Sequence, residues 1–488
     1  MAKDSSGKEE KKMGITAKKE ADFSEWYVQI LINSGFIDYS DVSGAIVFKP
    51  DSYFVWEGIQ RAVDPLFKKE GIQNVYFPLF IPEKLLNKEK EHIEGFSAEV
   101  AWVTEAGSSK LDEKLAVRPT SETIMYASYS KWIRSWRDLP LRLNQWNNVV
   151  RWEFKHPVPF LRTREFLWNE GHTAFATKEE ADAERDPILG IYEHVLKDYM
   201  ALPYVKGKKT PSETFPGALG TYSLEHLLPS GRALQGPDWH SDGQNFSKAF
   251  DISFLSKEGK KEYVYQNTFA ISTREIGVMV ATHSDNKGLV IPPRLARIQA
   301  VIIPIYNNEN KVEVLKYAAQ IHDSIKDDFR VMLDDDDSYS PGWKFNQYEM
   351  TGVPVRVEVG KRDLDAQKAV LVRRDNGVKE AVDVASIKGK INEALESMHR
   401  NLYDKAKAFM DANTIAVQTY DELKKRADKG GFMQTPWCGS EACEAKIKEE
   451  TGLKGTNMPF EAQDKAKGKK CVYCGNEAKS IVNFAKSY

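Results

Sequence analysis

The stretch from residue 144 to 175 combines residue types that bind nucleotides. Strand-like alternation over residues 149–154 places Arg151 and Glu153 on one face of a predicted strand. After a turn-like segment, a second extended run places a further set on one face at period two: Arg162, Arg164, Phe166, Trp168, Glu170 and His172. Arginine binds phosphate oxygens, and a carboxylate accepts a hydrogen bond from an amine. The pattern predicts an antiparallel strand pair that binds a planar ligand carrying phosphates.

A solvated strand face with incidental ion pairs is the alternative interpretation of this pattern. Phe166 and Trp168 count against it, because two large rings beside several charges would be exposed to water. Stacking of a base on an aromatic ring accounts for both features at once.

Three short motifs follow one another in an order that resembles the signature motifs of class II aminoacyl-tRNA synthetases. They are Val75-Tyr76-Phe77-Pro78, then Arg151-x-Glu153 with Arg162-x-x-x-Phe166, and then Ser272-Thr273-Arg274. The resemblance implies an antiparallel-sheet catalytic domain and a homodimer that uses the first motif. It also implies an ATP site, with Mg²⁺, in which Arg151 binds the α-phosphate, Glu153 the adenine amine and Arg162 the γ-phosphate. Phe166 would stack on adenine, and Gln235, Ser272 and Arg274 would complete the site.

Two further segments resemble prolyl-tRNA synthetases of the eukaryote-like and archaeal type. They are Arg-Pro-Thr-Ser-Glu-Thr at residues 118–123 and Phe-Leu-Trp-Asn-Glu-Gly-His-Thr at residues 166–173. The resemblance implies that Thr120 and Glu122 bind the amino group of L-proline and that Arg151 binds its carboxylate. The implied pocket walls are Trp168, Glu170, His172 and His240. Helix capping is the alternative for Thr120 and Glu122, and a satisfied core histidine is the alternative for His172 and His240.

One segment, residues 235–246, departs from the family pattern. Asp238 stands where a pocket threonine is expected, and Trp239 and Asp242 are also unusual there. A related class II synthetase with a shifted amino-acid preference is therefore one alternative function. A non-catalytic tRNA-binding paralogue is another, but it is disfavoured because the ATP-motif residues are all present.

All four cysteines lie near the end of the sequence, in the spacing C-x4-C and C-x2-C: Cys438, Cys443, Cys471 and Cys474. Four thiolates in two pairs suit a tetrahedral structural Zn²⁺. Unrelated free thiols are the alternative, and a disulfide framework is disfavoured without a secretion signal. The spacing is similar to that of the zinc-binding C-terminal domain of the same subgroup, and the resemblance implies that Tyr488 reaches the active site.

Strands alternating with helices between residues 298 and 403 predict a small α/β domain. Residues 341–363 resemble the anticodon-binding domain of the same family. The resemblance implies that anticodon bases of tRNA(Pro) are bound by Glu349, Arg356, Arg362 and Asp363, where arginine and aspartate match guanine edges. Ordinary surface charge is the alternative for each of the four.

Composition and periodicity divide the 488 residues into four parts. These are a disordered polar tail (1–20) and three folded parts (21–297, 298–403 and 404–488). The resemblance implies that the folded parts are the catalytic domain, the anticodon-binding α/β domain and a zinc-binding α+β domain, in that order. No stretch approaches the roughly 18 uninterrupted apolar residues of a membrane span, so a cytoplasmic location without membrane partners is expected. Because the net charge is only -2, with 69 basic and 71 acidic residues, tRNA must bind a local basic patch.

Overall fold

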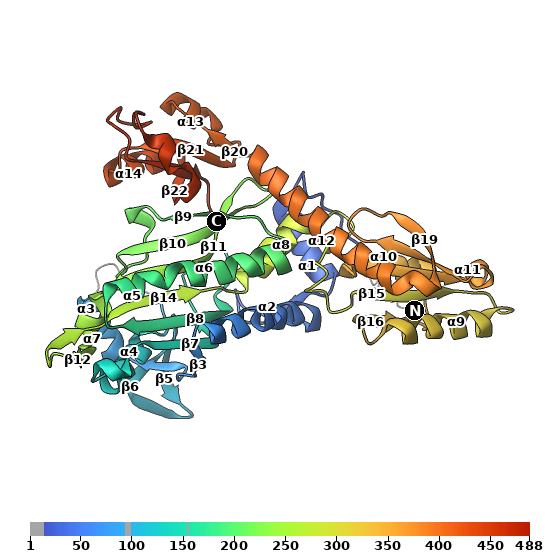
Figure 1. Cartoon of the computed structure of the whole chain (residues 1–488), viewed down its shortest axis with the longest axis horizontal. Coiled ribbons are helices and arrows are strands. Elements are labelled where there is room, and N and C mark those ends of the chain that lie inside the picture. Colours follow the sequence, from blue (N-terminus) through green and yellow to red (C-terminus); the bar gives the residue numbers. More distant parts are fainter. Residues whose placement is uncertain (1–13, 93–98, 154–155) are drawn as a thin grey trace, which may run out of the picture.

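The computed structural model describes residues 14–92, 99–153 and 156–488 (Figure 1). Most of the predicted polar tail, and Phe154 and Lys155 of the predicted nucleotide-binding pattern, lie outside the described residues. Residues 14–20 differ from the expectation of disorder. Lys19 Nζ donates hydrogen bonds to the carbonyl oxygens of Thr282 (3.1 Å) and Ser284 (2.7 Å), so this segment packs on the catalytic domain.

The predicted catalytic domain is built on one large sheet. Among the described residues this sheet has 11 strands in the order β20-β21-β23-β22-β9-β10-β11-β14-β8-β7-β3. Its catalytic strands are antiparallel except for the pair β3 and β7. They are β9 (Val205–Lys208), β10 (Gly220–Leu227), β11 (Ala233–Gly243), β14 (Tyr265–Ala270), β8 (Glu165–Phe175), β7 (Leu141–Val150) and β3 (Gln73–Asn74).

The remaining four strands of the sheet come from the end of the chain. They are β22 (Lys454–Pro459), β23 (Ser480–Ala485), β21 (Phe432–Trp437) and β20 (Thr414–Ala416). β22 pairs with β9 through Met458 opposite Lys208 and Pro459 opposite Gly207. The predicted C-terminal unit therefore continues the catalytic sheet, as Figure 1 shows in red beside β9 and β10.

Helices pack on one face of this sheet, and an apolar core lies between the helices and the sheet. They are α1 (Phe23–Asn33), α2 (Pro50–Lys69), α6 (Arg185–His194) and α8 (Arg274–His283). Apolar residues recur along α2 at helical spacing, including Val55, Ile59 and Val63, and these side chains are fully buried. The sheet contributes Trp239 and Phe269 to the same core. The opposite face is left to carry polar side chains and is covered at one end by α4 (Glu122–Trp132) and α7 (Asn245–Phe250).

Smaller elements frame this core. Three small sheets pair β1 (Ile37–Tyr39) with β2 (Ile46–Phe48), β12 (Ser253–Leu255) with β13 (Lys261–Tyr263), and β6 (Ser109–Val117) with both β4 (Phe80–Pro82) and β5 (Trp102–Ala106). The further helices are α3 (Glu83–His92) and α5 (Lys178–Ala183). Thr177 forms a capping box with Glu180 at the start of α5.

The α/β region forms a separate five-stranded sheet in the order β16-β15-β17-β18-β19. Its elements agree with the predicted alternation: β15 (Ala300–Ile305), α9 (Lys311–Ile325), β16 (Val331–Leu333), α10 (Pro341–Thr351), β17 (Val355–Gly360), α11 (Lys361–Ala366), β18 (Lys368–Arg373) and β19 (Lys379–Asp383). The long helix α12 (Ile387–Ala412) then runs to the C-terminal region, which adds α13 (Tyr420–Arg426) and α14 (Glu441–Thr451). The division proposed between residues 403 and 404 lies inside α12.

The strand pair predicted for the nucleotide site exists, but with different limits. β7 begins at Leu141 and ends at Val150, so Arg151 and Glu153 follow the strand instead of lying on its face. β8 begins at Glu165, opposite Val150, so Arg162 and Arg164 precede it. The intervening residues include Pro157 and Pro159, and proline provides no N–H for a strand ladder. No helix among the described residues is long and apolar enough to cross a bilayer.

Candidate active site

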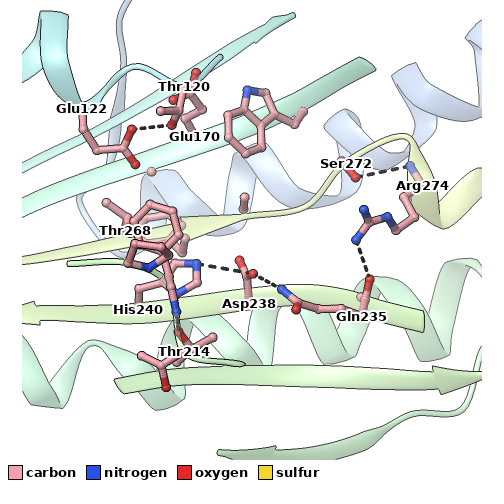
Figure 2. A pocket seen from close by; sticks show the side chains of 18 of the residues that line it. Thr120, Glu122, Glu170, Thr214, Gln235, Asp238, His240, Thr268, Ser272 and Arg274 are labelled. Carbon is pink, nitrogen blue, oxygen red and sulfur yellow. Dashed lines mark hydrogen bonds and ion pairs between the residues drawn. The ribbon is translucent and has the colours of Figure 1, made fainter. Parts of the chain in front are cut away.

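A cavity of about 410 Å³ opens on the polar face of the sheet (Figure 2). It brings together residues from α4, β8, β11, β14 and the start of α8. Among the predicted residues, its lining includes Thr120, Glu122, Arg151, Phe166, Trp168, Glu170, His172, Gln235, Asp238, His240, Ser272 and Arg274. The sequence motifs, although separated by up to 154 positions between Thr120 and Arg274, thus converge on one site.

Thr120 and Glu122 lie where the chain enters α4. The Thr120 hydroxyl donates to Glu122 Oε2, and both side chains are buried. The residue at the helix N-cap is Ser121, and no side-chain capping bond forms there. Ser121 instead donates through its amide (2.9 Å) and hydroxyl (2.7 Å) to the Glu170 carboxylate. The first turn of α4 therefore faces the cavity with polar groups that capping does not explain.

Glu170 is the most heavily hydrogen-bonded carboxylate of the cavity wall. Besides Ser121, it accepts from Asn147 Nδ2 (2.6 Å) and lies 3.2 Å from His172 Nε2. Burial opposes ionisation of Glu170, but the hydrogen bonds from His172, Asn147 and Ser121 outweigh it and lower its pKa. The other ring nitrogen of His172 lies 3.2 Å from the Tyr126 hydroxyl. His172 is thus both a satisfied buried histidine and part of the wall.

Arg151 lies against the aromatic residues of the predicted motif. Its guanidinium carbon is 5.4 Å from the Phe166 ring centroid and 5.2 Å from that of Trp168, and Nε donates to the Pro119 carbonyl (2.9 Å). Arg274 donates to the Gln235 carbonyl (3.1 Å) at the other side of the opening. Two guanidinium groups therefore lie at one end of the cavity, where they can bind an anion.

A second cavity of about 270 Å³ shares Arg151, Gln235 and Arg274 with the first. Its lining adds the other residues predicted for ATP and for the end of the chain: Glu153, Arg162 and Tyr488. Tyr488 lies beside β11, where its amide donates to the Ala233 carbonyl (3.4 Å). Two adjoining cavities with common arginines match a site for two reactants.

The unusual residues of segment 235–246 take three different positions. Asp238 lines the larger cavity, but its carboxylate accepts from Gln235 Nε2 (2.6 Å) and lies 3.4 Å from His240 Nε2. Trp239 points to the other face of the sheet and is buried in the helix-covered core. Asp242 is fully buried, and burial together with the nearby Glu122 carboxylate raises its pKa well above the ordinary value. Only Asp238 therefore contributes a side chain to the cavity lining.

Sequence reasoning missed several residues of the larger cavity. A segment between β9 and β10 contributes Ser212, Glu213, Thr214, Phe215 and Pro216. Thr221, on β10, also lines it and lies 2.8 Å from His240 Nδ1. The adjoining Pro211–Glu213 turn is a short 3₁₀ helix. No residue type or spacing in this segment indicates chemistry, so the sequence held no local signal for it.

The four cysteines meet in the C-terminal region. Cys438 Sγ lies 3.6 Å from both Cys443 Sγ and Cys474 Sγ, and the four sulfurs lie within 4.8 Å of one another. Zinc–sulfur bonds of about 2.3 Å give sulfur separations of about 3.8 Å in a tetrahedron. The geometry fits a zinc ion bound by Cys438, Cys443, Cys471 and Cys474.

The predicted anticodon residues fall into two groups. Arg356 is buried and lies 3.4 Å from Glu349 and 3.0 Å from Glu358. Asp363 accepts from the Gly360 amide (2.8 Å) and so caps α11, whereas Arg362 is exposed. Glu349 and Arg356 therefore form one polar network, while Asp363 has a structural role in the helix cap.

Comparison with known proteins agrees with this arrangement. Residues 102–283 match the model "tRNA synthetase class II core domain (G, H, P, S and T)", residues 299–394 "Anticodon binding domain", and residues 420–488 "Prolyl-tRNA synthetase, C-terminal". A crystal structure of prolyl-tRNA synthetase from Cryptosporidium parvum, in complex with halofuginone and AMPPNP, aligns with a TM-score of 0.93. It is 44% identical, and the match covers 98% of this chain and 100% of that one.

The fold and the site define a class II aminoacyl-tRNA synthetase. Proline–tRNA ligase 2 of Bacillus thuringiensis (strain Al Hakam) is 47% identical over 472 residues, 96% of this chain and 98% of the relative. Proline–tRNA ligase of Alkaliphilus oremlandii is 47% identical over 470 residues, 96% and 97% of the two chains. The chain belongs to the proline–tRNA ligase family. The fold class and the enzyme class predicted from the sequence are confirmed.

Proposed function

We propose that the larger cavity binds L-proline, that ATP binds in the smaller cavity and extends into the adjoining part of the larger one lined by Phe166 and Ser272, and that Arg151 joins the two substrates. The observation that carries this proposal is the position of Arg151 in the lining of both cavities, held by Phe166, Trp168 and the Pro119 carbonyl. The nucleotide analogue AMPPNP, present in the complex of the related Cryptosporidium parvum synthetase, supports ATP as the second substrate.

The reaction needs alignment and charge stabilisation more than a protein nucleophile. A proline carboxylate oxygen attacks the α-phosphorus of ATP, pyrophosphate leaves, and prolyl-adenylate remains. Negative charge on the phosphoryl oxygens is stabilised by the Arg151 and Arg274 guanidinium groups, which are already fixed by hydrogen bonds. Magnesium, when bound with ATP, supplies additional positive charge. The 3′-terminal hydroxyl of tRNA(Pro) then takes the prolyl group from the adenylate, and AMP leaves.

The proline end of the cavity is acidic. Glu122, with the Thr120 hydroxyl bound to it, is available to accept from the proline ammonium group, and Glu170 is held in the wall as a carboxylate. Trp168 and Phe215 supply apolar surface for the ring. Asp238 is engaged by Gln235 and His240, so its unusual identity does not remove the proline site. Proline is therefore favoured over a shifted amino-acid preference.

Three assembly features complete the proposal. A homodimer is supported by exposed aromatic residues in and against the first motif: Tyr76 is 72% exposed, and Trp132, which contacts Phe77, is 50% exposed.

Anticodon bases of tRNA(Pro) would bind near Glu349, Arg356 and Arg362. One structural zinc per chain would bind the four cysteines. Reduced thiols of this kind suit the cytoplasm.

Arg151→Ala tests the central assignment by proline-dependent ATP–pyrophosphate exchange. We expect the exchange rate to fall about 1,000-fold, because the group that stabilises the phosphoryl charge is removed. The melting temperature should stay within about 3 °C of wild type, since Arg151 lies after the end of the strand. Arg164→Ala is the matched control, because Arg164 is outside both cavity linings. Exchange measured with all twenty amino acids should rank proline first. Wild-type exchange by Arg151→Ala, or a better substrate than proline, would refute the proposal.

A further inference from the structure

The segment from Lys209 to Pro216 contributes its second half, Ser212 to Pro216, to a wall of the larger cavity. Contacts inside the site hold this half in place. The Phe215 ring centroid lies 4.9 Å from that of His240. The Phe215 amide donates to Thr221 Oγ1 (3.0 Å), which is itself 2.8 Å from His240 Nδ1. The position of this segment therefore sets one side of the space available to the amino acid.

The same segment is held from outside by the C-terminal region. Thr210 Oγ1 donates to Glu444 Oε1 (2.7 Å), and both residues are buried, with exposures of 0% and 3%. Lys454 Nζ lies 3.8 Å from Glu213 Oε1 in a second, partly exposed contact. A Cβ atom on Gly455 would lie 2.6 Å from Glu444 Oε1. The glycine therefore allows β22 to approach this contact closely.

Glu444 is an unusual residue for the position that it occupies. It lies in the first turn of α14, directly after Cys443, and no salt bridge joins it to a basic side chain within the described part of the chain. Removing a carboxylate from water without a cationic partner opposes folding. Proteins keep local violations of this kind mainly at functional or strained sites. The Glu444 carboxylate accepts its hydrogen bond from the catalytic region, at Thr210.

We infer that Glu444 is a positioning residue for the amino-acid pocket, acting through Thr210 on segment 209–216. The inference rests on the assignment of the larger cavity to proline. Cys443 belongs to the thiol cluster, and the next residue, Glu444, is hydrogen-bonded to Thr210 of the segment. The start of α14 is therefore held at two adjacent residues. The C-terminal region thereby helps to shape a pocket to which it contributes no lining residue.

The consequence is selective weakening of proline binding when the contact is removed. In Glu444→Ala the hydrogen bond to Thr210 is lost, so the wall is less well fixed and the KM for proline rises about tenfold. The kcat stays within about twofold, because Arg151 and Arg274 are not on the segment. Glu444→Gln keeps an acceptor oxygen and should retain nearly wild-type kinetics.

Thr210→Val removes the same hydrogen bond from the other partner without disturbing α14. It should raise the KM for proline as much as Glu444→Ala does, and the double variant should be no worse than either single one. Glu449→Ala, an exposed position on the same helix paired with Lys446, is the matched control and should change nothing. Unchanged proline KM in both Glu444→Ala and Thr210→Val would overturn the inference.

A second readout does not depend on catalysis. Hydrogen exchange of the amides at Glu213, Thr214 and Phe215, which are hydrogen-bonded here, should accelerate in Glu444→Ala and Thr210→Val and remain slow in Glu449→Ala. Zinc content should equal that of wild type in all variants. Unchanged exchange at these amides would overturn the inference. A different result would be faster hydrogen exchange at these amides together with full activity of the Arg151→Ala enzyme. In that case the contact between Glu444 and the segment would stand, and the assignment of the larger cavity to proline would be wrong.

Discussion

The two regions that follow the catalytic domain are attached to it in different ways. The anticodon-binding region has its own five-stranded sheet and contacts the catalytic domain through side chains and single backbone bonds. Arg374 forms two hydrogen bonds to Asp285 (2.7 and 2.8 Å), and the Leu289 amide donates to the Met350 carbonyl (3.0 Å). The C-terminal region instead shares a sheet with the catalytic domain, because β22 pairs with β9.

This difference has a functional consequence. A strand in a shared sheet fixes its neighbour along a ladder of backbone hydrogen bonds, and β9 leads directly into the segment that lines the larger cavity. A region docked through side chains has no such ladder. We therefore expect changes in the C-terminal region to affect proline activation, which needs no tRNA, and changes in the anticodon-binding region to affect only the transfer to tRNA.

The largest effect expected on this comparison comes from the thiol cluster. Cys443→Ser combined with Cys471→Ser removes two of four ligands, so zinc should be lost and the strands that continue the catalytic sheet should be destabilised. Proline-dependent pyrophosphate exchange should fall by at least about 100-fold, roughly 2.7 kcal/mol in activation free energy. Metal analysis and exchange on the same preparation measure both effects. Ser440→Ala, beside the cluster, is the control; a zinc-free variant with full exchange would remove the proposed dependence.

A smaller effect is expected from a change in the anticodon-binding region, and it should fall on the transfer to tRNA instead of on proline activation. Arg356→Ala should lower kcat/KM for aminoacylation of tRNA(Pro) by about 10- to 100-fold, the range for one lost base contact of about 1–3 kcal/mol. Pyrophosphate exchange should stay within about twofold of wild type, because exchange does not use tRNA. Lys379→Ala, which removes another partner of Glu358, is the matched control. If Arg356→Ala lowers exchange as strongly as aminoacylation, the two regions do not differ in the way proposed.

Local motifs were enough to predict most of the candidate site, but contacts between distant segments were not. Arg151, Phe166 and Trp168 are close in sequence, and the predicted strand pair brings them together. The limits of the strands were less predictable, because the alternation that favours a strand continues through residues 149–154 although β7 ends at Val150. Thr210 and Glu444 are separated by 234 positions, and each is an ordinary residue in its own segment. Neither the shared sheet nor this contact leaves a periodic signal in the sequence.

The smallest effect concerns the last two residues, Ser487 and Tyr488, and it tests how far the C-terminal region influences the ATP side of the site. Tyr488 lines the smaller cavity with Arg151 and Arg274, and its ring lies 5.3 Å from the Arg232 guanidinium carbon. Arg232 also donates to the Ser487 carbonyl (3.1 Å). These contacts are few and partly exposed, so their loss should leave the sheet and the zinc content unchanged.

Deletion of Ser487 and Tyr488 should nevertheless lower kcat/KM for proline-dependent exchange by about three- to fivefold, less than about 1 kcal/mol. The reason is that the cavity loses a wall beside the arginine that joins the two substrates, so Arg151 is more exposed to water and its interaction with the phosphoryl charge weakens. Lys486→Ala is the matched control, because Lys486 contacts Asp428 (2.6 Å) away from the cavity. If the deletion has wild-type kinetics, the C-terminal region acts on proline activation only through the β22–β9 pairing and Glu444. Tyr488 would then be only a packing residue.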